Sequence, residues 1–458
     1  MTLDGVRSNS ASPGSLKDFQ HLAFEELAQR DPELFTLLEQ DLHRQSNTLM
    51  MVAASSVAPP PVLASAGTAL GNITAEGYPG ARYHAGCEVA DEVERIAVRR
   101  ARAAFGAHHA NVQPHSGSSA NLAVLFSLMR PGETMLALDL DAGGHLTHGA
   151  AASVTGRYFD AVHYGLDEHG RIDLPAVREL AERHRPRVIV CGASAYPRTL
   201  DFAAFRQIAD AVGAWLVADV SHIAGLVVAG LHPSPIDHAH VTTTSTYKQL
   251  YGPRGGLILL GADHDTPVRP GGPTLAQALN RAIFPLSQGT PNLAAVAAKA
   301  HALGLVTTPQ FRELAELIVA DAAALADSMS AEGFAVLFGG TDNHMVLVDL
   351  VSHGLTGTVA ESALESCGIV VNKNRIPGDT RPPTVASGMR LGTNTLAQRG
   401  MGPDQMPVLA RLLDHILCHV KPTSDESYQL DPDVRAEVRR TVAELCRRYP
   451  LPGYPLAS

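Results

Sequence analysis

The chain has 458 residues, of which 45% are hydrophobic and 18% charged, and its formal net charge is −10 at pH 7. This length predicts two or three domains. The acidic balance, and the absence of any apolar run of about 18 residues, give no indication of a nucleic-acid partner or a membrane span. The five cysteines form no C-x-x-C spacing, so we predict no metal site, no disulfide framework and a cytoplasmic location.

The N-terminal part combines a polar start with one helical pattern. Residues 1–30 open with a polar stretch that contains Ser, Gly and Pro, and we predict a disordered segment there. Asp31 and Pro32 then give a helix start signal, and leucines follow at positions 34, 37, 38 and 42. We therefore expect residues 31–84 to form a helix that packs on another element, followed by an arm.

The remainder of the chain divides into two patterns. Residues 85–300 alternate between short strands rich in Val, Ile and Leu and helices of about 10 to 15 residues, which is typical of a mostly parallel sheet covered on both faces. Residues 301–458 mix strands with helices, including long ones at 311–329, 404–420 and 433–448. We predict a large α/β domain followed by a smaller α+β domain.

A lysine surrounded by hydroxyl groups is the first chemical signal. Lys248 follows five Ser/Thr residues and Tyr247 in the sequence T-T-T-S-T-Y-K. Small hydroxyls can bind phosphate oxygens, and a partly desolvated lysine loses enough pKa to form a Schiff base. The same pattern also fits a threonine-rich strand that ends in an exposed lysine.

An acid at the end of the preceding strand strengthens the first of these alternatives. Asp219 closes the apolar run W-L-V-A-D and should emerge at the carboxyl edge of the sheet, where α/β proteins bind ligands. A carboxylate there can keep a pyridine nitrogen protonated, although an aspartate at this position can also serve only to form a turn. The pair of Asp219 and Lys248 favours a site for pyridoxal 5'-phosphate.

Two further segments fit such a site. S-G-S-S-A-N at 116–121 opens a predicted helix, and its backbone N–H groups could hold a phosphate, although a serine cap alone is ordinary. In G-G-H-L-T-H-G at 143–149, His145 could lie flat against a cofactor ring. The H-x-x-H spacing also suggests metal ligands, but no carboxylate or cysteine is spaced to complete such a site.

These residues resemble the serine hydroxymethyltransferase family, whose members are fold-type I pyridoxal-phosphate enzymes. The resemblance extends over about residues 31–420 and includes eight stretches in the family's order. They are A-E-G-Y-P-G-A-R-Y, A-N-V-Q-P-H-S-G-S, G-G-H-L-T-H-G, D-V-S-H-I-A-G-L, T-Y-K-Q-L-Y-G-P-R-G-G, G-G-T-D-N-H, V-N-K-N and S-G-M-R-L-G-T.

The resemblance implies roles for individual residues. Lys248 is similar to the Schiff-base lysine, Asp219 to the partner of the ring nitrogen and Arg390 to the clamp for the substrate carboxylate. Glu76 is similar to the acid/base at the substrate hydroxyl. The cofactor contacts implied by the family are Ser116, Gly117, Ser118, His145, Ser194, His222, Tyr247, Gln288 and Gly289, the last two from across the interface of a homodimer with shared active sites.

The chain departs from the family around the substrate and the phosphate. Thr74 replaces a tyrosine, His84 follows Tyr83 where the family has Tyr-Tyr, Ala54 replaces a serine near the substrate carboxylate, and Tyr247 replaces a histidine. The glycine-rich G-G-Q-G-G-P segment has become L-S-Q-G-T-P. We count Ala54, Thr74, Tyr83 and His84 with Arg390 as candidate substrate contacts.

This pattern resembles the L-threonine transaldolases, a divergent branch of the family often found in antibiotic pathways. The resemblance implies cleavage of threonine to acetaldehyde and a glycine carbanion that adds to a second aldehyde, giving a β-hydroxy-α-amino acid. Serine hydroxymethyltransferase activity, a lyase acting on a bulky amino-acid conjugate and a non-catalytic relative are the alternatives. Use of tetrahydrofolate stays open, because residues matching folate contacts are retained at Glu76, Tyr83, Leu140, Leu146 and Asn374.

Overall fold

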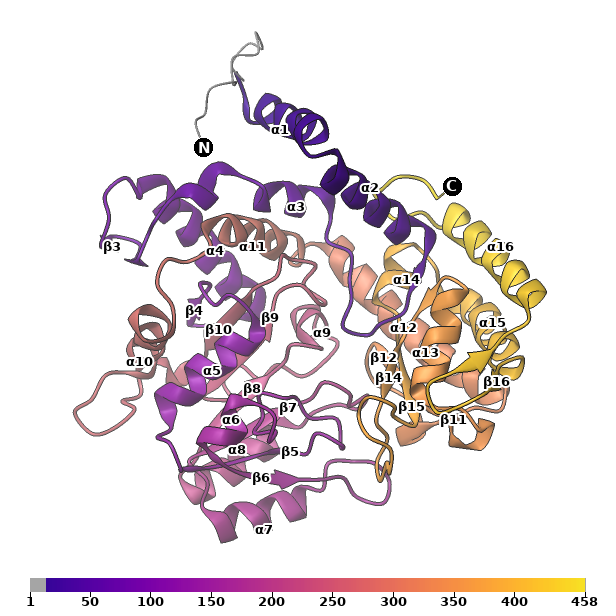
Figure 1. Ribbon diagram of the computed structural model, residues 1–458. Helices are drawn as coiled ribbons and strands as arrows, with labels where there is room; N and C mark the ends of the chain where they lie inside the picture. Colours follow the sequence, from indigo (N-terminus) through magenta and orange to yellow (C-terminus); the bar gives the residue numbers. More distant parts are fainter. Residues whose placement is uncertain (1–13, 458) are drawn as a thin grey trace.

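The computed structural model describes residues 14–457, and its centre is a seven-stranded sheet with the order β4-β10-β9-β8-β7-β5-β6 (Figure 1). β10 pairs antiparallel with both neighbours, whereas the pairs from β9 to β6 are parallel. The predicted α/β class with a mostly parallel sheet is confirmed. The strands are β4 (His109–Asn111), β5 (Thr134–Leu138), β6 (Asp160–Tyr164), β7 (Val188–Gly192), β8 (Trp215–Asp219), β9 (Val241–Ser245) and β10 (Gly256–Leu260).

Both faces of this sheet are buried. In β8, Leu216 and Ala218 belong to one hydrophobic core, and Trp215 and Val217 belong to another, as the two-residue period of a strand requires. A strand covered on both sides has no polar face, which explains its continuous apolar sequence. The helices of this part are α4 (Glu88–Phe105), α5 (Gly117–Leu128), α6 (Val154–Tyr158), α7 (Leu174–His184), α8 (Phe202–Val212), α9 (Ala224–Val228), α10 (Leu275–Arg281) and α11 (Leu293–Leu305).

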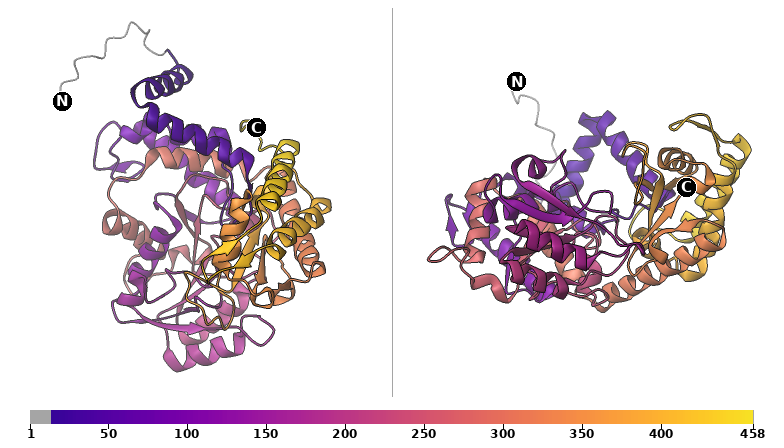
Figure 2. Two further views of the ribbon diagram at one scale, coloured as in Figure 1. Left: turned by 45° about the vertical axis from the view of Figure 1, so that its right-hand side comes forward. Right: turned by 90° about the horizontal axis from the view of Figure 1, so that it is seen from below.

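The C-terminal part has its own antiparallel sheet, with the order β11-β12-β15-β14, and its own hydrophobic core. Both views in Figure 2 show it beside the large sheet. Its strands are β11 (Ala335–Val336), β12 (Met345–Asp349), β14 (Asn372–Asn374) and β15 (Gly388–Gly392). Its helices are α12 (Pro309–Ala331), α13 (Gly357–Ser366), α14 (Asn394–Gln398), α15 (Met406–Cys418) and α16 (Pro432–Arg448).

The N-terminal part is more helical than the sequence suggested. The prediction of disorder is wrong for α1 (Leu16–Arg30), because the Ser15 side chain accepts the backbone N–H of Asp18 and caps a regular helix. Residues 1–13 of that prediction lie outside the described residues. α2 (Pro32–Asn47) begins at Asp31 as predicted. α3 (Pro60–Ala66) follows, and the short strands are β1 (Leu49–Met50), β2 (Gly77–Tyr78), β3 (Ala81–Arg82), β13 (Ile369–Val370), β16 (Lys421–Pro422) and β17 (Tyr428–Gln429).

β1 pairs in parallel with β13, so the segment after α2 is attached to the C-terminal part of the molecule. Across residues 14–457, no helix is both long enough and apolar enough to span a lipid bilayer.

Candidate functional site

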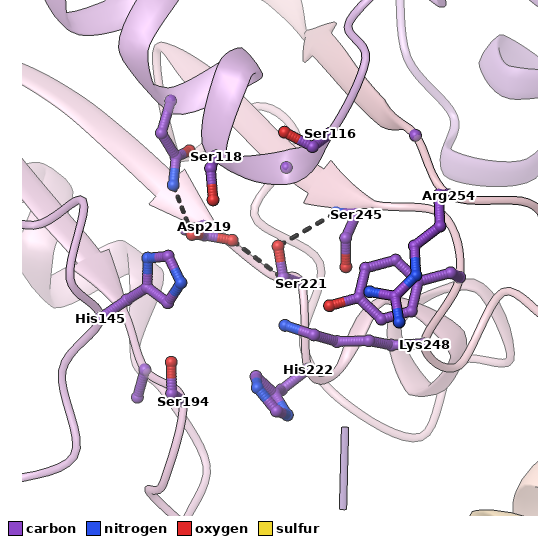
Figure 3. Close-up of a pocket in the computed structure, with 15 residues that line it drawn as sticks. Ser116, Ser118, His145, Ser194, Asp219, Ser221, His222, Ser245, Lys248 and Arg254 are labelled. Atoms are coloured by element: carbon purple, nitrogen blue, oxygen red, sulfur yellow. Dashed lines mark hydrogen bonds between the residues drawn. The ribbon is translucent and has the colours of Figure 1, made fainter. Parts of the chain in front are cut away.

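A cavity with an empty volume of about 630 Å³ lies where β7, β8 and β9 end (Figure 3). The register brings these ends together, because Gly192 pairs with Asp219, and Asp219 pairs with Thr243. The structure collects many of the predicted site residues here. The lining consists of Ser116, Gly117, Ser118, Asn121, His145, Ala193, Ser194, Asp219, Ser221, His222, Ser245, Tyr247, Lys248, Arg254 and Gly255.

Asp219 is held as a carboxylate at one end of the cavity. Its Oδ2 accepts hydrogen bonds from Asn121 Nδ2 at 2.7 Å and from His148 Nε2 at 3.1 Å, and its Oδ1 accepts from the N–H of Ser221 at 3.0 Å. Burial opposes ionisation, but the bond and charge of His148, together with His145 and Ser221, hold the pKa of Asp219 well below its ordinary value. This acid can therefore keep a cofactor ring nitrogen protonated.

His145 lies beside this acid as a neutral ring. Its Nδ1 accepts the backbone N–H of Thr147 at 3.2 Å, which leaves the ring proton to Nε2. Burial, aided by the charges of His148 and Lys248, lowers the pKa of His145 to about 4 despite the opposing charge of Asp219. A neutral imidazole suits the predicted stacking against an aromatic cofactor.

The expectation that no carboxylate joins the two histidines of the H-x-x-H motif is wrong. Asp219 of β8 lies within 4.8 Å of ligand atoms of both His145 and His148. The chain fold brings the carboxylate there, not local spacing. His148 donates to Asp219, so this contact belongs to the network that fixes the acid.

Lys248 extends into the middle of the cavity from the segment after β9 (Figure 3). It is 7% exposed, and burial, together with the charges of Arg390 and Arg254, lowers the pKa of Lys248 to about 8, while Asp219 opposes this shift. A fraction of the amine is therefore neutral near pH 7 and can attack an aldehyde carbon. The alternative of an exposed lysine at a strand end does not apply.

The other end of the cavity is suited to a phosphate. Ser116 caps α5, because its hydroxyl accepts the N–H of Ser119 at 3.0 Å, and the N–H groups of Gly117 and Ser118 have no partner within the helix. A Cβ added to Gly117 would lie 3.1 Å from Cβ of Ser245, so glycine allows this close approach. Within the described part of the chain, the buried Ser245 Oγ and His222 Nδ1 have no hydrogen-bond partner, as expected of groups that bind a ligand.

Arg390 reaches the site from the small sheet. It lies on β15, and its guanidinium donates from Nε to Asn372 Oδ1 at 3.1 Å and from Nη1 to the carbonyl of Ser194, a residue that lines the cavity. Burial lowers the pKa of Arg390 to about 10, so it stays cationic at neutral pH. A buried guanidinium at this edge can bind a substrate carboxylate.

The segment carrying Ala54 is fixed next to this arginine. The carbonyl of Ala53 accepts from His344 Nε2 and from Asn394 Nδ2, both at 3.1 Å. A Cβ on Gly392 would lie 2.4 Å from Cα of Ala53, so the segment packs directly against the end of β15. Ala54, which replaces a serine of the family, therefore lies in a segment next to the strand that carries Arg390.

Other predicted residues gather outside this cavity. Glu76 Oε2 lies 3.4 Å from His84 Nε2, and Glu76 Oε1 would lie 3.2 Å from a Cβ at Gly289. Gln288 bonds the backbone of Gln113 and His115, next to the Ser116 loop. Tyr83 is 75% exposed, and neither it nor Thr74 lines the cavity. Glu76 is likewise not among the residues that line the cavity around Lys248.

The sequence matches the serine hydroxymethyltransferase family profile over residues 27–413. The chain belongs to the serine hydroxymethyltransferase family. It is 47% identical to a serine hydroxymethyltransferase of Synechococcus sp. (strain JA-3-3Ab) over 442 residues, covering 94% of this chain and 97% of the relative. It is 46% identical to one of Coprothermobacter proteolyticus over 430 residues, covering 94% of this chain and 99% of the relative. As a member of this family, the chain is a fold-type I, pyridoxal-phosphate-dependent transferase of the aldol type.

Several residues of this serine hydroxymethyltransferase-family site were missed from the sequence. Asn121 and His148 stand inside segments that we singled out, yet their contact with Asp219 depends on the assembled sheet. His344 stands in the G-G-T-D-N-H stretch. The chemistry of these residues could have been suspected from those motifs, but their partners could not.

The residues fit pyridoxal phosphate. The carboxylate, the buried lysine and the helix N-terminus match its ring nitrogen, its aldehyde and its phosphate, and the unpartnered Ser245 and His222 add two further polar contacts. Lys248 would bind the aldehyde carbon covalently. Asp219 would hold the proton on the ring nitrogen, and His145 would cover the ring.

Proposed function

We propose that the protein is a serine hydroxymethyltransferase: it breaks the Cα–Cβ bond of L-serine, releases glycine and transfers the one-carbon unit to tetrahydrofolate. The observation that carries this proposal is the pair of Lys248 and ionised Asp219 in one cavity, with Arg390 bonded to Ser194 at its edge. Similarity to proteins of that name along almost the whole chain supports it.

Pyridoxal phosphate, when bound, supplies an electron sink for the electron pair released as the Cα–Cβ bond breaks. Arg390 binds the serine carboxylate and so orients the bond to be broken. Asp219 would keep the proton at the ring nitrogen, and the Lys248 amine would hold the cofactor in the cavity. Glu76 moves the proton at the substrate hydroxyl.

We further propose a homodimer with shared active sites. Glu76 and His84 are half-exposed and do not line the cavity that contains Lys248, so we infer that a second copy supplies the group that acts at the substrate hydroxyl. The N-terminal helices also expose large apolar side chains, with Phe24 60% and Leu37 56% exposed. A partner chain that covers these side chains would remove them from water.

A second candidate is L-threonine transaldolase activity, with an aldehyde in place of the folate-borne unit. Tyr247, where the family usually has histidine, lines the cavity, and Ala54 stands in the segment packed against the end of β15. These are the positions at which a change of substrate would be expected. Restoring the family residues with Tyr247→His and Ala54→Ser should then raise the ratio of serine to threonine turnover.

One paired assay distinguishes the two candidates. The cofactor-loaded protein is given L-serine with tetrahydrofolate, or L-threonine with an aromatic aldehyde and no folate, and glycine and acetaldehyde are measured. We expect folate-dependent glycine formation to be the faster reaction. Absence of that reaction, with acetaldehyde release that requires the second aldehyde, would replace the first candidate by the second. Lys248→Ala should abolish both activities, and Lys421→Ala, at an exposed position on β16, should change neither.

A further inference from the structure

Arg254 brings a guanidinium to the phosphate end of the cavity. It lies in the connection between β9 and β10, and its Cζ is 3.8 Å from the centre of the Tyr247 ring. Figure 3 shows Arg254 beside Ser245, at the end of the pocket away from His145. The positive charge of Arg254 contributes to the lowered pKa of Lys248. If the cofactor ring lies against His145 and Asp219, its phosphate would lie at the opposite end of the cavity, which is the end where Arg254 lies.

This guanidinium has no anionic partner in the protein. Within residues 14–457 it takes part in no hydrogen bond or ion pair, and its contact is the face of Tyr247. The carboxylate that lines the cavity, Asp219, is bound by Asn121 and His148 at the other end. A cavity on the other side of Arg254 also has no carboxylate among the described residues that line it. The region around Arg254 therefore has uncompensated positive charge.

A second observation indicates that an oxygen-bearing group binds here. Ser245 is 3% exposed and lines the cavity, yet its hydroxyl has no partner among the described residues. We propose that Arg254 binds the phosphate of pyridoxal phosphate together with Ser245 and the N-terminus of α5. The inference rests on the cofactor assignment and adds a residue to it.

The substrate carboxylate is the less suitable ligand for Arg254. Arg390 is the arginine connected to the substrate side, because it donates to the Ser194 carbonyl and to Asn372. Arg254 instead lies near the helix N-terminus and Ser245, which are groups that suit phosphate oxygens. Arg390 is therefore suited to the substrate carboxylate, and Arg254 to the phosphate.

Tyr247 acts as the positioning residue for Arg254. A guanidinium lying on a tyrosine face is attracted by the negative π-surface and loses side-chain freedom before any ligand arrives. The histidine usual in the family has a smaller ring and would repel a cation when protonated. Tyrosine at 247 therefore suits a contact with Arg254 better than histidine does.

The test compares a ligand that has the phosphate with one that lacks it. The cofactor-free protein is titrated with pyridoxal phosphate and with pyridoxal, and the ratio of the two dissociation constants measures the phosphate contribution. Arg254→Gln should reduce this ratio by about tenfold or more and leave pyridoxal binding unchanged. Inorganic phosphate, used as a competitor, should lose affinity to a similar degree.

Variants of Tyr247 test the positioning role. Tyr247→Phe keeps the ring and should preserve the ratio, whereas Tyr247→Ala should lower it, with no further loss when combined with Arg254→Gln. Equal weakening of both ligands in Arg254→Gln, or no weakening of either, would overturn the proposal. If the unaltered protein fails to bind pyridoxal phosphate, the cofactor assignment itself is wrong, and the outcome is distinguishable from failure of Arg254 alone.

Discussion

A buried acid on the helix that is bonded to the end of β15 gives a quantitative prediction. Asp321 lies on α12, its side chain is 0% exposed, and neither carboxyl oxygen has a partner among the described residues. One turn earlier, the carbonyl of Ile318 accepts from Thr393 Oγ1 at 2.7 Å, which connects this helix to the end of β15. Burial raises the pKa of Asp321 from 3.8 to about 8.

The direction of the pH effect follows from proton binding. The folded protein retains the proton on Asp321 at pH values where the unfolded chain has lost it, so the free energy of unfolding falls as pH rises between about 4 and about 8. Each pH unit in that window corresponds to about 1.4 kcal/mol. From pH 5 to pH 7 this residue alone lowers the free energy of unfolding by about 2.7 kcal/mol.

The assay is urea unfolding of Asp321→Asn and the unaltered protein at pH 5, 6 and 7. The amide does not titrate, so the stability advantage of the variant should grow by about 2.7 kcal/mol across this range. Asp327→Asn, at an exposed position on the same helix, is the matched control and should show no such growth. A difference for Asp321→Asn that stays constant with pH would refute the reasoning.

Three further variants examine the contacts around the site. Asn121→Ala removes one hydrogen bond from Asp219 and should lower kcat and cofactor affinity by about ten- to hundredfold, measured by steady-state kinetics and cofactor titration. Lys299→Met leaves three backbone carbonyls without their buried donor and should lower the free energy of unfolding by about 3 kcal/mol or more in urea titrations. His344→Phe keeps an aromatic ring but loses the bond to the Ala53 carbonyl, so the KM for the amino acid should rise more than kcat falls.

The parts of the site that could be predicted are those encoded locally. Asp219 ends a buried strand and Lys248 follows the next one, and parallel strands present their carboxyl ends at the same edge. The register then requires the two residues to face one cavity. The mostly parallel sheet could be predicted for the same reason, because the alternation of strands and helices is visible in local hydrophobic patterns.

Other parts lacked a local signal. α11 has the sequence L-A-A-V-A-A-K-A-H-A-L-G-L and is buried at Leu293, Ala294, Val296, Ala298 and Lys299, so no polar face marks its period. Lys299 sits within it because three carbonyls from distant segments accept its ammonium protons. The contacts of Asn121 with Asp219 and Thr243 likewise join three separate elements. Only the assembled fold supplies such partners.

The charges around the cavity connect the binding of two anions to the protonation of Lys248. Arg390 and Arg254 both lower the pKa of Lys248, while Asp219 raises it, and burial adds the largest lowering. Before ligands bind, these two cations favour the neutral amine that must attack the cofactor aldehyde. A phosphate at Arg254 and a carboxylate at Arg390 would neutralise them, and this would favour the protonated amine. The residues that bind the two anions would therefore also adjust the protonation of Lys248 as each ligand arrives.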